Sequence, residues 1–135
     1  MTDHNQGIIE EFRTHRGVVG GYFEGRTLLL LTHEGAVTGT VRTNPLAYRR
    51  EDDRIFIFAS KGGSPHHPDW YRNIVANPDV TVEIGDDRFA ATAVVVTGAE
   101  RDAIYARQSQ EWPAFGGYQT KVDRTIPVVE LVPNG

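Results

Sequence analysis

The sequence contains no cysteine. This absence excludes a disulfide framework, thiolate metal sites and cysteine nucleophiles, and it fits the cytoplasmic location that we expect. No apolar run approaches the roughly 20 residues that a membrane-spanning helix needs. The N-terminus also lacks the basic start and the apolar segment of a secretory signal. We therefore expect neither a transmembrane span nor export by that route.

Basic residues are in the minority, with 14 Lys and Arg against 18 Asp and Glu and a formal net charge of −4. Proteins that bind nucleic acid neutralise its phosphates with an excess of positive charge or with a basic run, and neither is present here. We expect no nucleic-acid partner. A small anion could still bind in a local basic pocket.

The chain has 135 residues, which is enough for one core, and we expect a single domain over 1–135. Residues 1–26 precede the first strand signal, and we interpret them as an N-terminal helix and cap segment. Ile8, Ile9 and Phe12 give this segment one apolar face. Such a face most often covers a core, while a ligand-facing role and peripheral membrane contact stay open as alternatives.

Strand signals occur in six segments, namely 27–33, 40–50, 53–60, 79–85, 88–98 and 126–132. Helices are expected over 68–76, which begins with a proline, and over 98–110, where Thr97 and Glu100 form a capping box. The order of elements shows no regular βαβ alternation. We therefore predict a mainly β fold with short helices, in which about six mostly antiparallel strands form a barrel.

Two of the predicted strands have special features. Segment 53–60 alternates isoleucine with phenylalanine, so both of its faces are apolar and the strand should be central. Segment 40–50 contains Pro45, which cannot donate a hydrogen bond to a neighbouring strand and therefore predicts an edge, a bulge or a bend. A ligand often lies where such a bend opens a sheet.

The stretch after segment 53–60 contains two adjacent histidines. His66, His67 and Asp69 offer metal-ligand chemistry, but neighbouring loop residues seldom converge on one ion, and we expect exposed loop histidines and no metal. Nucleophilic hydrolysis has no anchor either. None of Ser60, Ser64 and Ser109 lies in a G-x-S-x-G turn.

Lys61, Gly62 and Gly63 follow the predicted central strand directly. Glycines allow backbone N–H groups to approach an anion closely, although an ordinary turn that uses two glycines for its dihedral angles explains them equally well. The anion interpretation gains support from Arg42 and Pro45, because an antiparallel pairing of segments 40–50 and 53–60 would bring them alongside 58–61.

Three stretches, 28–48, 58–84 and 123–131, together resemble the deazaflavin-dependent nitroreductase and quinone reductase family of actinobacteria. The resemblance implies a split β-barrel of the FMN-binding-like type. It also implies an oxidoreductase that transfers a hydride from reduced coenzyme F420 to a small quinone, nitro compound or activated enone. FMN binding and a non-catalytic deazaflavin carrier are the alternatives.

The resemblance further implies a set of cofactor contacts. They lie in a G-x-x-[ST]-G-x-x-R motif, in a segment beside the deazaflavin ring, in an S-K-G-G turn and in a P-x-W-Y-x-N helix start. The matching residues are Thr38, Gly39, Arg42, Asn44, Pro45, Ser60, Lys61, Gly62, Gly63, Pro68, Trp70, Tyr71 and Asn73.

The chain departs from the family pattern in two places. Ala36 and Val37 stand where family members commonly have basic residues, so Arg42 and Lys61 would carry more of the anion contact. The substrate side, where the nitroreductase type has spaced tyrosines, here corresponds to Trp112, Phe115 and Tyr118. Tyr118 is the candidate for donating a hydrogen bond or a proton to the acceptor. Monomer and homodimer both remain open.

Overall fold

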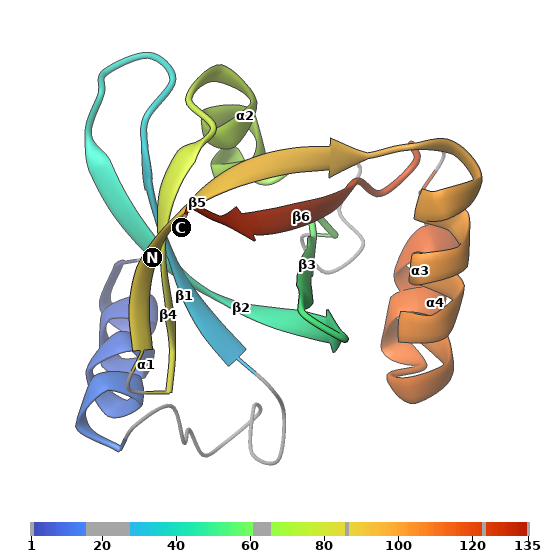
Figure 1. Cartoon of the computed structure of the whole chain (residues 1–135), viewed down its shortest axis with the longest axis horizontal. Coiled ribbons are helices and arrows are strands. Elements are labelled where there is room, and N and C mark those ends of the chain that lie inside the picture. The colour runs from blue at the N-terminus through green and yellow to red at the C-terminus, as the bar shows by residue number, and fades with distance from the viewer. Residues whose placement is uncertain (1, 16–27, 61–65, 86, 123, 135) are drawn as a thin grey trace.

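The computed structural model describes residues 2–15, 28–60, 66–85, 87–122 and 124–134. As predicted, six antiparallel strands form a barrel (Figure 1). The barrel is closed, and the strand order, which the sequence did not predict, is β1-β2-β3-β6-β5-β4. The strands are β1 (Leu28–Glu34), β2 (Val41–Glu51), β3 (Arg54–Phe58), β4 (Asp79–Ile84), β5 (Asp87–Val96) and β6 (Val128–Pro133). The helices are α1 (Thr2–Thr14), α2 (Asp69–Ala76), α3 (Gly98–Glu111) and α4 (Ala114–Thr120).

The longest strand, β2, is paired unequally along its two sides. It pairs with β1 from Val41 to Ala47, but with β3 only from Tyr48 to Glu51. The barrel is completed by β6, which lies between β3 and β5. The first half of β2 therefore has a strand neighbour on one side only within the described part of the chain.

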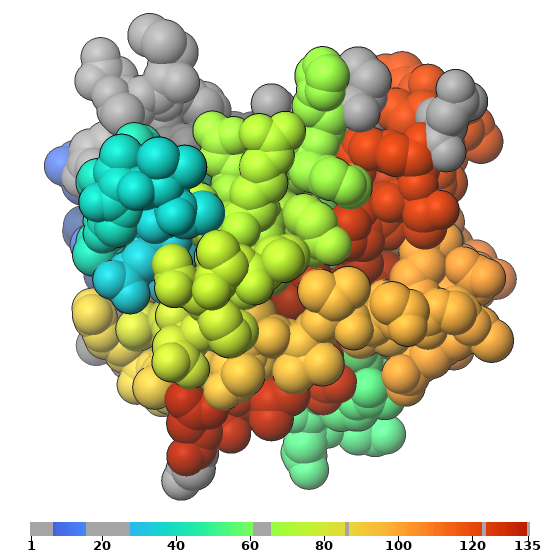
Figure 2. Space-filling view, turned by 90° about the horizontal axis from the view of Figure 1, so that it is seen from above, coloured from blue at the N-terminus to red at the C-terminus, as the bar shows by residue number. Residues whose placement is uncertain are grey.

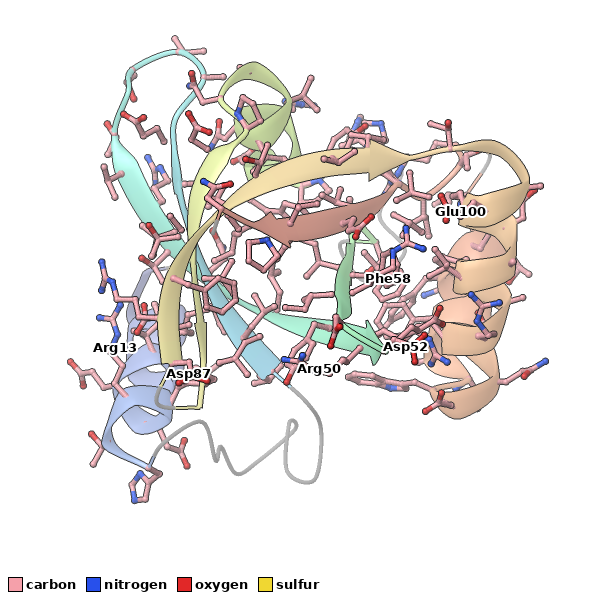
Figure 3. The ribbon with its side chains drawn as sticks, viewed as in Figure 1. Arg13, Arg50, Asp52, Phe58, Asp87 and Glu100 are labelled. Carbon is pink, nitrogen blue, oxygen red and sulfur yellow. The ribbon has the colours of Figure 1, made fainter. Side chains whose placement is uncertain are left out.

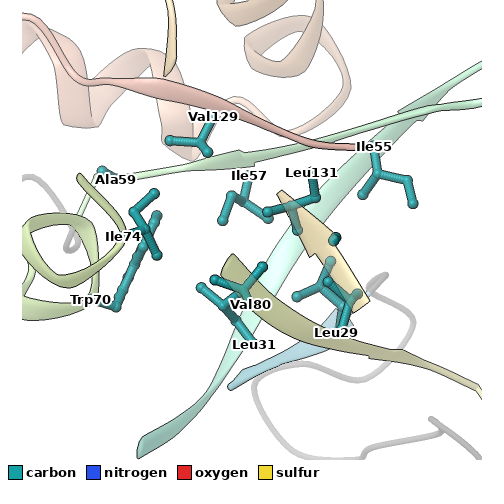
Figure 4. Packing of buried hydrophobic residues seen from close by; sticks show 12 residues of the cluster. Leu29, Leu31, Ile55, Ile57, Ala59, Trp70, Ile74, Val80, Val129 and Leu131 are labelled. Carbon is teal, nitrogen blue, oxygen red and sulfur yellow. The ribbon is translucent and has the colours of Figure 1, made fainter. Parts of the chain in front are cut away.

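Alternation along β3 sends its side chains into two different clusters of the core. Ile55 and Ile57 point into the barrel, where α2 adds Trp70 and Ile74 from one end (Figure 4). Phe56 and Phe58 point outward and are buried under α3 and α4. Both faces of β3 are thus covered, which confirms the prediction of a central strand.

The apolar face of α1 packs on the outside of the barrel. Ile9 and Phe12 are buried against Leu28 and Leu30 of β1, and Ile8 packs at the rim of the same cluster. The core-covering interpretation is therefore correct, and these side chains are not displayed for a membrane. None of the helices in the described residues is long and apolar enough to span a bilayer.

Two helix starts differ from expectation. Pro68, the predicted first helical residue, is instead the N-cap of α2, which begins one residue later at Asp69. Thr97 is the N-cap of α3, but its side chain makes no capping hydrogen bond, so the capping box is wrong. Glu100 instead pairs with Arg54, whose guanidinium lies 3.0 Å from its carboxylate. The cross-element ion pair has replaced the local bond.

Helix α4 was not predicted at all. Its sequence contains Gly116 and Gly117, which lower helix propensity. Tertiary contacts compensate, because Phe115 packs against Phe58 and its carbonyl oxygen accepts a 2.5 Å hydrogen bond from the Tyr105 hydroxyl. Phe58 points from β3 toward α3 and α4 in Figure 3.

Candidate active site

The open half of β2 is the part of the barrel best placed to receive a ligand. Asn44 and Pro45 are half-buried there and pair only with Leu31 and Leu30 of β1. The strand runs through Pro45 without interruption, and β3 does not pair with this part of it. Of the edge, bulge or bend that Pro45 predicted, the structure shows the edge. Proline is tolerated because the ladder to β3 does not extend to this position.

Arg42 and Pro45 have different neighbours from those predicted. The pairing partners of Arg42 and Pro45 are His33 and Leu30 of β1, and the β2–β3 ladder ends at Tyr48. The strands have separated before segment 58–61 could come alongside. Within the described part of the chain, this separation leaves the first half of β2 without a strand partner on that side.

A polar network joins this edge to α2. His33 is only 2% exposed, and its Nε2 lies 2.7 Å from Asn44 Oδ1. Its Nδ1 lies 3.1 Å from Asn73 Nδ2, and Asn73 Oδ1 accepts a 2.9 Å hydrogen bond from the backbone N–H of Ala36. Burial lowers the pKa of His33, and the nearby Arg42 lowers it further, against the opposing effect of the bond to Asn44.

His33 did not emerge as a candidate from the sequence. A signal was present, since it follows Leu29 and Leu31 with the period of a strand and therefore shares their core-facing side. A histidine at the end of such a stripe must find hydrogen-bond partners. Which partners these are depends on α2, forty residues away.

A second polar cluster lies at the other side of the open edge, around Arg124. Its guanidinium donates to the carbonyl oxygens of Ala59 and Ser60 at 3.1 and 3.0 Å, and to His67 Nδ1 at 2.9 Å. Ser60 is buried. Lys61, Gly62 and Gly63, which follow it, lie outside the described residues. Nothing in the sequence around Arg124 marked it as a contact of this turn.

The adjacent histidines His66 and His67 differ in burial. His66 is exposed as expected, but His67 is half-buried, and its ring lies 4.8 Å from that of Tyr71. Burial, Arg124 and Arg72 all lower the pKa of His67. Among the described residues, no three His, Asp or Glu side chains gather as a metal site would require.

The loop between β1 and β2 holds Thr38 and Gly39. The hydroxyl of Thr38 bonds to that of Thr40 at 2.8 Å, and Gly39 adopts a φ of 73° that favours glycine. A Cβ added at Gly39 would meet no atom within 4 Å. The loop conformation explains this glycine, and the surface beside it is open.

The predicted helix-start residues differ in burial and in their contacts. Pro68 and Trp70 are buried, and Trp70 belongs to the interior core. Tyr71 is half-buried beside His67. The side-chain oxygen of the buried Asn73 is hydrogen-bonded to the backbone N–H of Ala36, and its side-chain nitrogen to His33.

The three residues expected on the substrate side lie together on and before α4. Phe115 is buried, and the rings of Trp112 and Tyr118 pack edge-on against it at 5.1 and 5.4 Å. Trp112 and Tyr118 are half-buried. Gln119 connects α4 to the polar cluster around Arg124, because its side-chain nitrogen donates a 2.8 Å hydrogen bond to the Arg124 carbonyl oxygen. Burial raises the pKa of the adjacent Tyr105 to about 12, so its hydroxyl stays protonated.

One face of the molecule carries all these features. In Figure 2 the β1–β2 hairpin (cyan), α2 (yellow-green) and the segment from α4 to β6 (orange-red) lie side by side. Positive charge gathers at the same face, since Arg42 acts on His33 while Arg72 and Arg124 act on His67. Amide donors, cations and aromatic rings beside an open strand edge suit a planar, anionic cofactor.

The barrel and its open edge place this chain in the split β-barrel class, whose fold is that of FMN-binding-like proteins. Among solved structures, the haem storage protein HutZ of Vibrio cholerae has this fold at 17% identity, with a TM-score of 0.64 over 97% of this chain and 91% of its own.

The chain belongs to the F420H(2)-dependent quinone reductase family, whose model matches residues 7–133. An F420H(2)-dependent quinone reductase of Mycobacterium tuberculosis is 40% identical over 126 residues, which cover 89% of this chain and 83% of that protein. These comparisons confirm the predicted family and its oxidoreductase class, and they favour F420 over FMN.

Solved structures agree with the family assignment. An F420-H2 dependent reductase, FDR-A, is 40% identical, with a TM-score of 0.71 over 78% of this chain and 94% of its own. A chain described as a domain-swapped dimer is 37% identical, with a TM-score of 0.73 over 96% of each chain.

Proposed function

We propose that this protein binds reduced coenzyme F420 along the open half of β2 and catalyses its oxidation by a small organic acceptor, with quinones as the first class to test. The observation that carries the proposal is that β2 pairs with β3 only from Tyr48 onward. The preceding part of β2 lacks this partner, and Asn44 and Pro45 lie half-buried there beside α2. When bound, the coenzyme supplies a hydride from its deazaflavin ring.

The protein's contribution is binding and orientation. Arg42, an exposed cation without an ion pair among the described residues, would attract the anionic groups of the coenzyme. Ser60 and the Lys-Gly-Gly sequence that follows it would hold the phosphate, with Arg124 fixing the carbonyl oxygens of Ala59 and Ser60. Arg124 is then a support that the sequence did not suggest.

The acceptor would lie against the α4 side. Trp112 and Tyr118 are half-buried there, whereas Phe115 is part of the core beneath them. We assign to the Tyr118 hydroxyl the hydrogen bond or proton that the acceptor needs as it gains charge. On this assignment Tyr118→Phe lowers kcat/KM for the true substrate.

The test combines binding with turnover. The purified full chain is titrated with F420 and, separately, with FMN, and reduced F420 is then mixed with quinones, nitroaromatics and enones while its absorbance is followed. We expect F420 binding and protein-dependent oxidation by at least one quinone. FMN binding without F420 binding would overturn the proposal.

Binding of F420 with no turnover across the whole panel would instead favour the carrier alternative. Size-exclusion chromatography in the same buffers settles the assembly state. A homodimer is the state that we propose to look for first, because one relative is described as a domain-swapped dimer.

A further inference from the structure

The hydrogen-bond network behind the open edge has a determined direction. A backbone N–H can only donate, so the amide of Asn73 must turn its oxygen toward Ala36. Its nitrogen then faces His33 and must donate to Nδ1. This bond requires Nδ1 to be an unprotonated acceptor.

This acceptor role of Nδ1 determines the tautomer of His33 and the direction of its hydrogen bond to Asn44. A neutral imidazole with an acceptor at Nδ1 carries its proton on Nε2, and Nε2 lies 2.7 Å from Asn44 Oδ1. His33 therefore donates to Asn44. The lowered pKa of His33 agrees with a neutral ring.

Asn44 is the end of the chain of donors. Its oxygen is occupied by His33, so the amide cannot flip without breaking the bond. Its NH2 group has no partner among the described residues, and the side chain is half-buried on the half of β2 that lacks a β3 neighbour. The network thus presents two N–H donors at a fixed place on the open edge.

We propose that Asn73 and His33 are positioning residues that hold the Asn44 amide with its NH2 group toward the cofactor, where it binds a carbonyl-type acceptor on the cofactor ring. The inference rests on the proposed function. It explains why a histidine is buried at 2% exposure beside the edge, and it predicts that a ring edge with a donor at this place is rejected.

The first measurement uses the free protein. Nitrogen-15 NMR of the His33 ring should show the neutral tautomer with the proton on Nε2. In Asn73→Asp the carboxylate still accepts from Ala36 but cannot donate, so Nδ1 of His33 should become protonated. A proton on Nδ1 in the wild type would overturn the inference, whatever the protein binds.

The second measurement is a double-mutant cycle on the dissociation constant for F420, followed by fluorescence. We expect Asn44→Leu and His33→Leu each to weaken binding about tenfold, which corresponds to one hydrogen bond, and the double variant to be no weaker than about tenfold. His33→Gln can accept from Asn73 and donate to Asn44, so it should restore most of the affinity.

Thr32→Val is the matched control, because it removes the 2.9 Å bond to Thr43 in the same strand pair but does not touch the network. Its affinity should equal that of the wild type. Additive losses in the cycle would overturn the inference while leaving the proposed function standing. A wild type that binds no F420 would overturn the proposed function and the cofactor role of Asn44, and the NMR result would then apply to the network alone.

Discussion

At the scale of single residues, His33 couples the stability of the protein to pH. Burial lowers its pKa in the folded state, whereas an unfolded histidine titrates near about 6.5. Below that pH the unfolded chain binds a proton that the folded protein does not. The free energy of unfolding must therefore fall as the pH is lowered from about 6.5 toward the folded pKa.

The prediction is that His33→Gln has a flatter pH dependence than the wild type between pH 7 and 5. One proton contributes a slope of up to about 1.4 kcal/mol per pH unit. Denaturant unfolding at a series of pH values measures it. His15→Gln, at the exposed position that follows α1, is the control and should keep the wild-type slope. Equal slopes in His33→Gln and the wild type would contradict the burial argument.

Residues of the site were predictable to the extent that they lie in local motifs. Pro45 and Ser60 were singled out from their positions on and after strands, and Asn44 from the resemblance to the family. Arg124 was not, because its three acceptors lie 57 to 65 residues away in the chain. Asn73 was predicted as a cofactor contact, and only the fold shows that both polar atoms of its amide are hydrogen-bonded within the chain.

At the scale of elements, α4 depends on the ring of Phe115 for its attachment. The side chain is 4% exposed and lies against Phe58, Tyr105 and the rings of its own segment. Helix propensity contributes little in a segment with two glycines. Loss of this side chain should therefore release the helix rather than reshape a pocket.

We expect Phe115→Ala to lower the free energy of unfolding by about 3 kcal/mol, as for other large buried side chains. Tyr118→Phe, on the same helix, keeps the ring that packs on Phe115 and should therefore cost less than Phe115→Ala. Urea denaturation followed by circular dichroism compares them. A Phe115→Ala protein as stable as the wild type would contradict the core role of Phe115 and favour the substrate contact that the resemblance implied.

Elements with strong local sequence patterns were the predictable ones. Strand β1 follows from a short apolar run, β3 from alternation, and the β4–β5 hairpin from the turn at Gly85, whose φ of 58° suits a tight connection. Helix α4 and the length of the β2–β3 ladder were not predictable. Both are set by contacts between segments distant in the sequence, which local propensity does not encode.

At the scale of the whole molecule, a net charge of −4 contrasts with the local cations of the candidate active site. An anionic cofactor is repelled by the chain as a whole and attracted by Arg42, Arg72 and Arg124 at short range. Added salt screens charges more than a Debye length apart, which is about 10 Å at 0.1 M and 3 Å at 1 M. Binding should therefore weaken with salt only if the local attraction dominates.

We predict that the dissociation constant for F420 rises by about threefold to tenfold between 50 and 500 mM NaCl, an order-of-magnitude expectation for a few screened contacts. Arg42→Gln should weaken binding at low salt and flatten this dependence. Arg88→Gln, in the β4–β5 hairpin at the end of the barrel away from the β1–β2 loop, is the matched control (Figure 1). A salt-independent constant would contradict the role of the arginines.

The position of β6 has a consequence for how the protein is made. This strand follows all the others in the chain, yet it lies between β3 and β5, and Phe58 finds its partner Val128 seventy residues later. A nascent chain on the ribosome cannot close the barrel before β6 emerges. Until then β3 and β5 expose unpaired edges, which are sites for chaperone binding and aggregation. Closure late in synthesis, and slow folding through this distant pairing, follow from the topology.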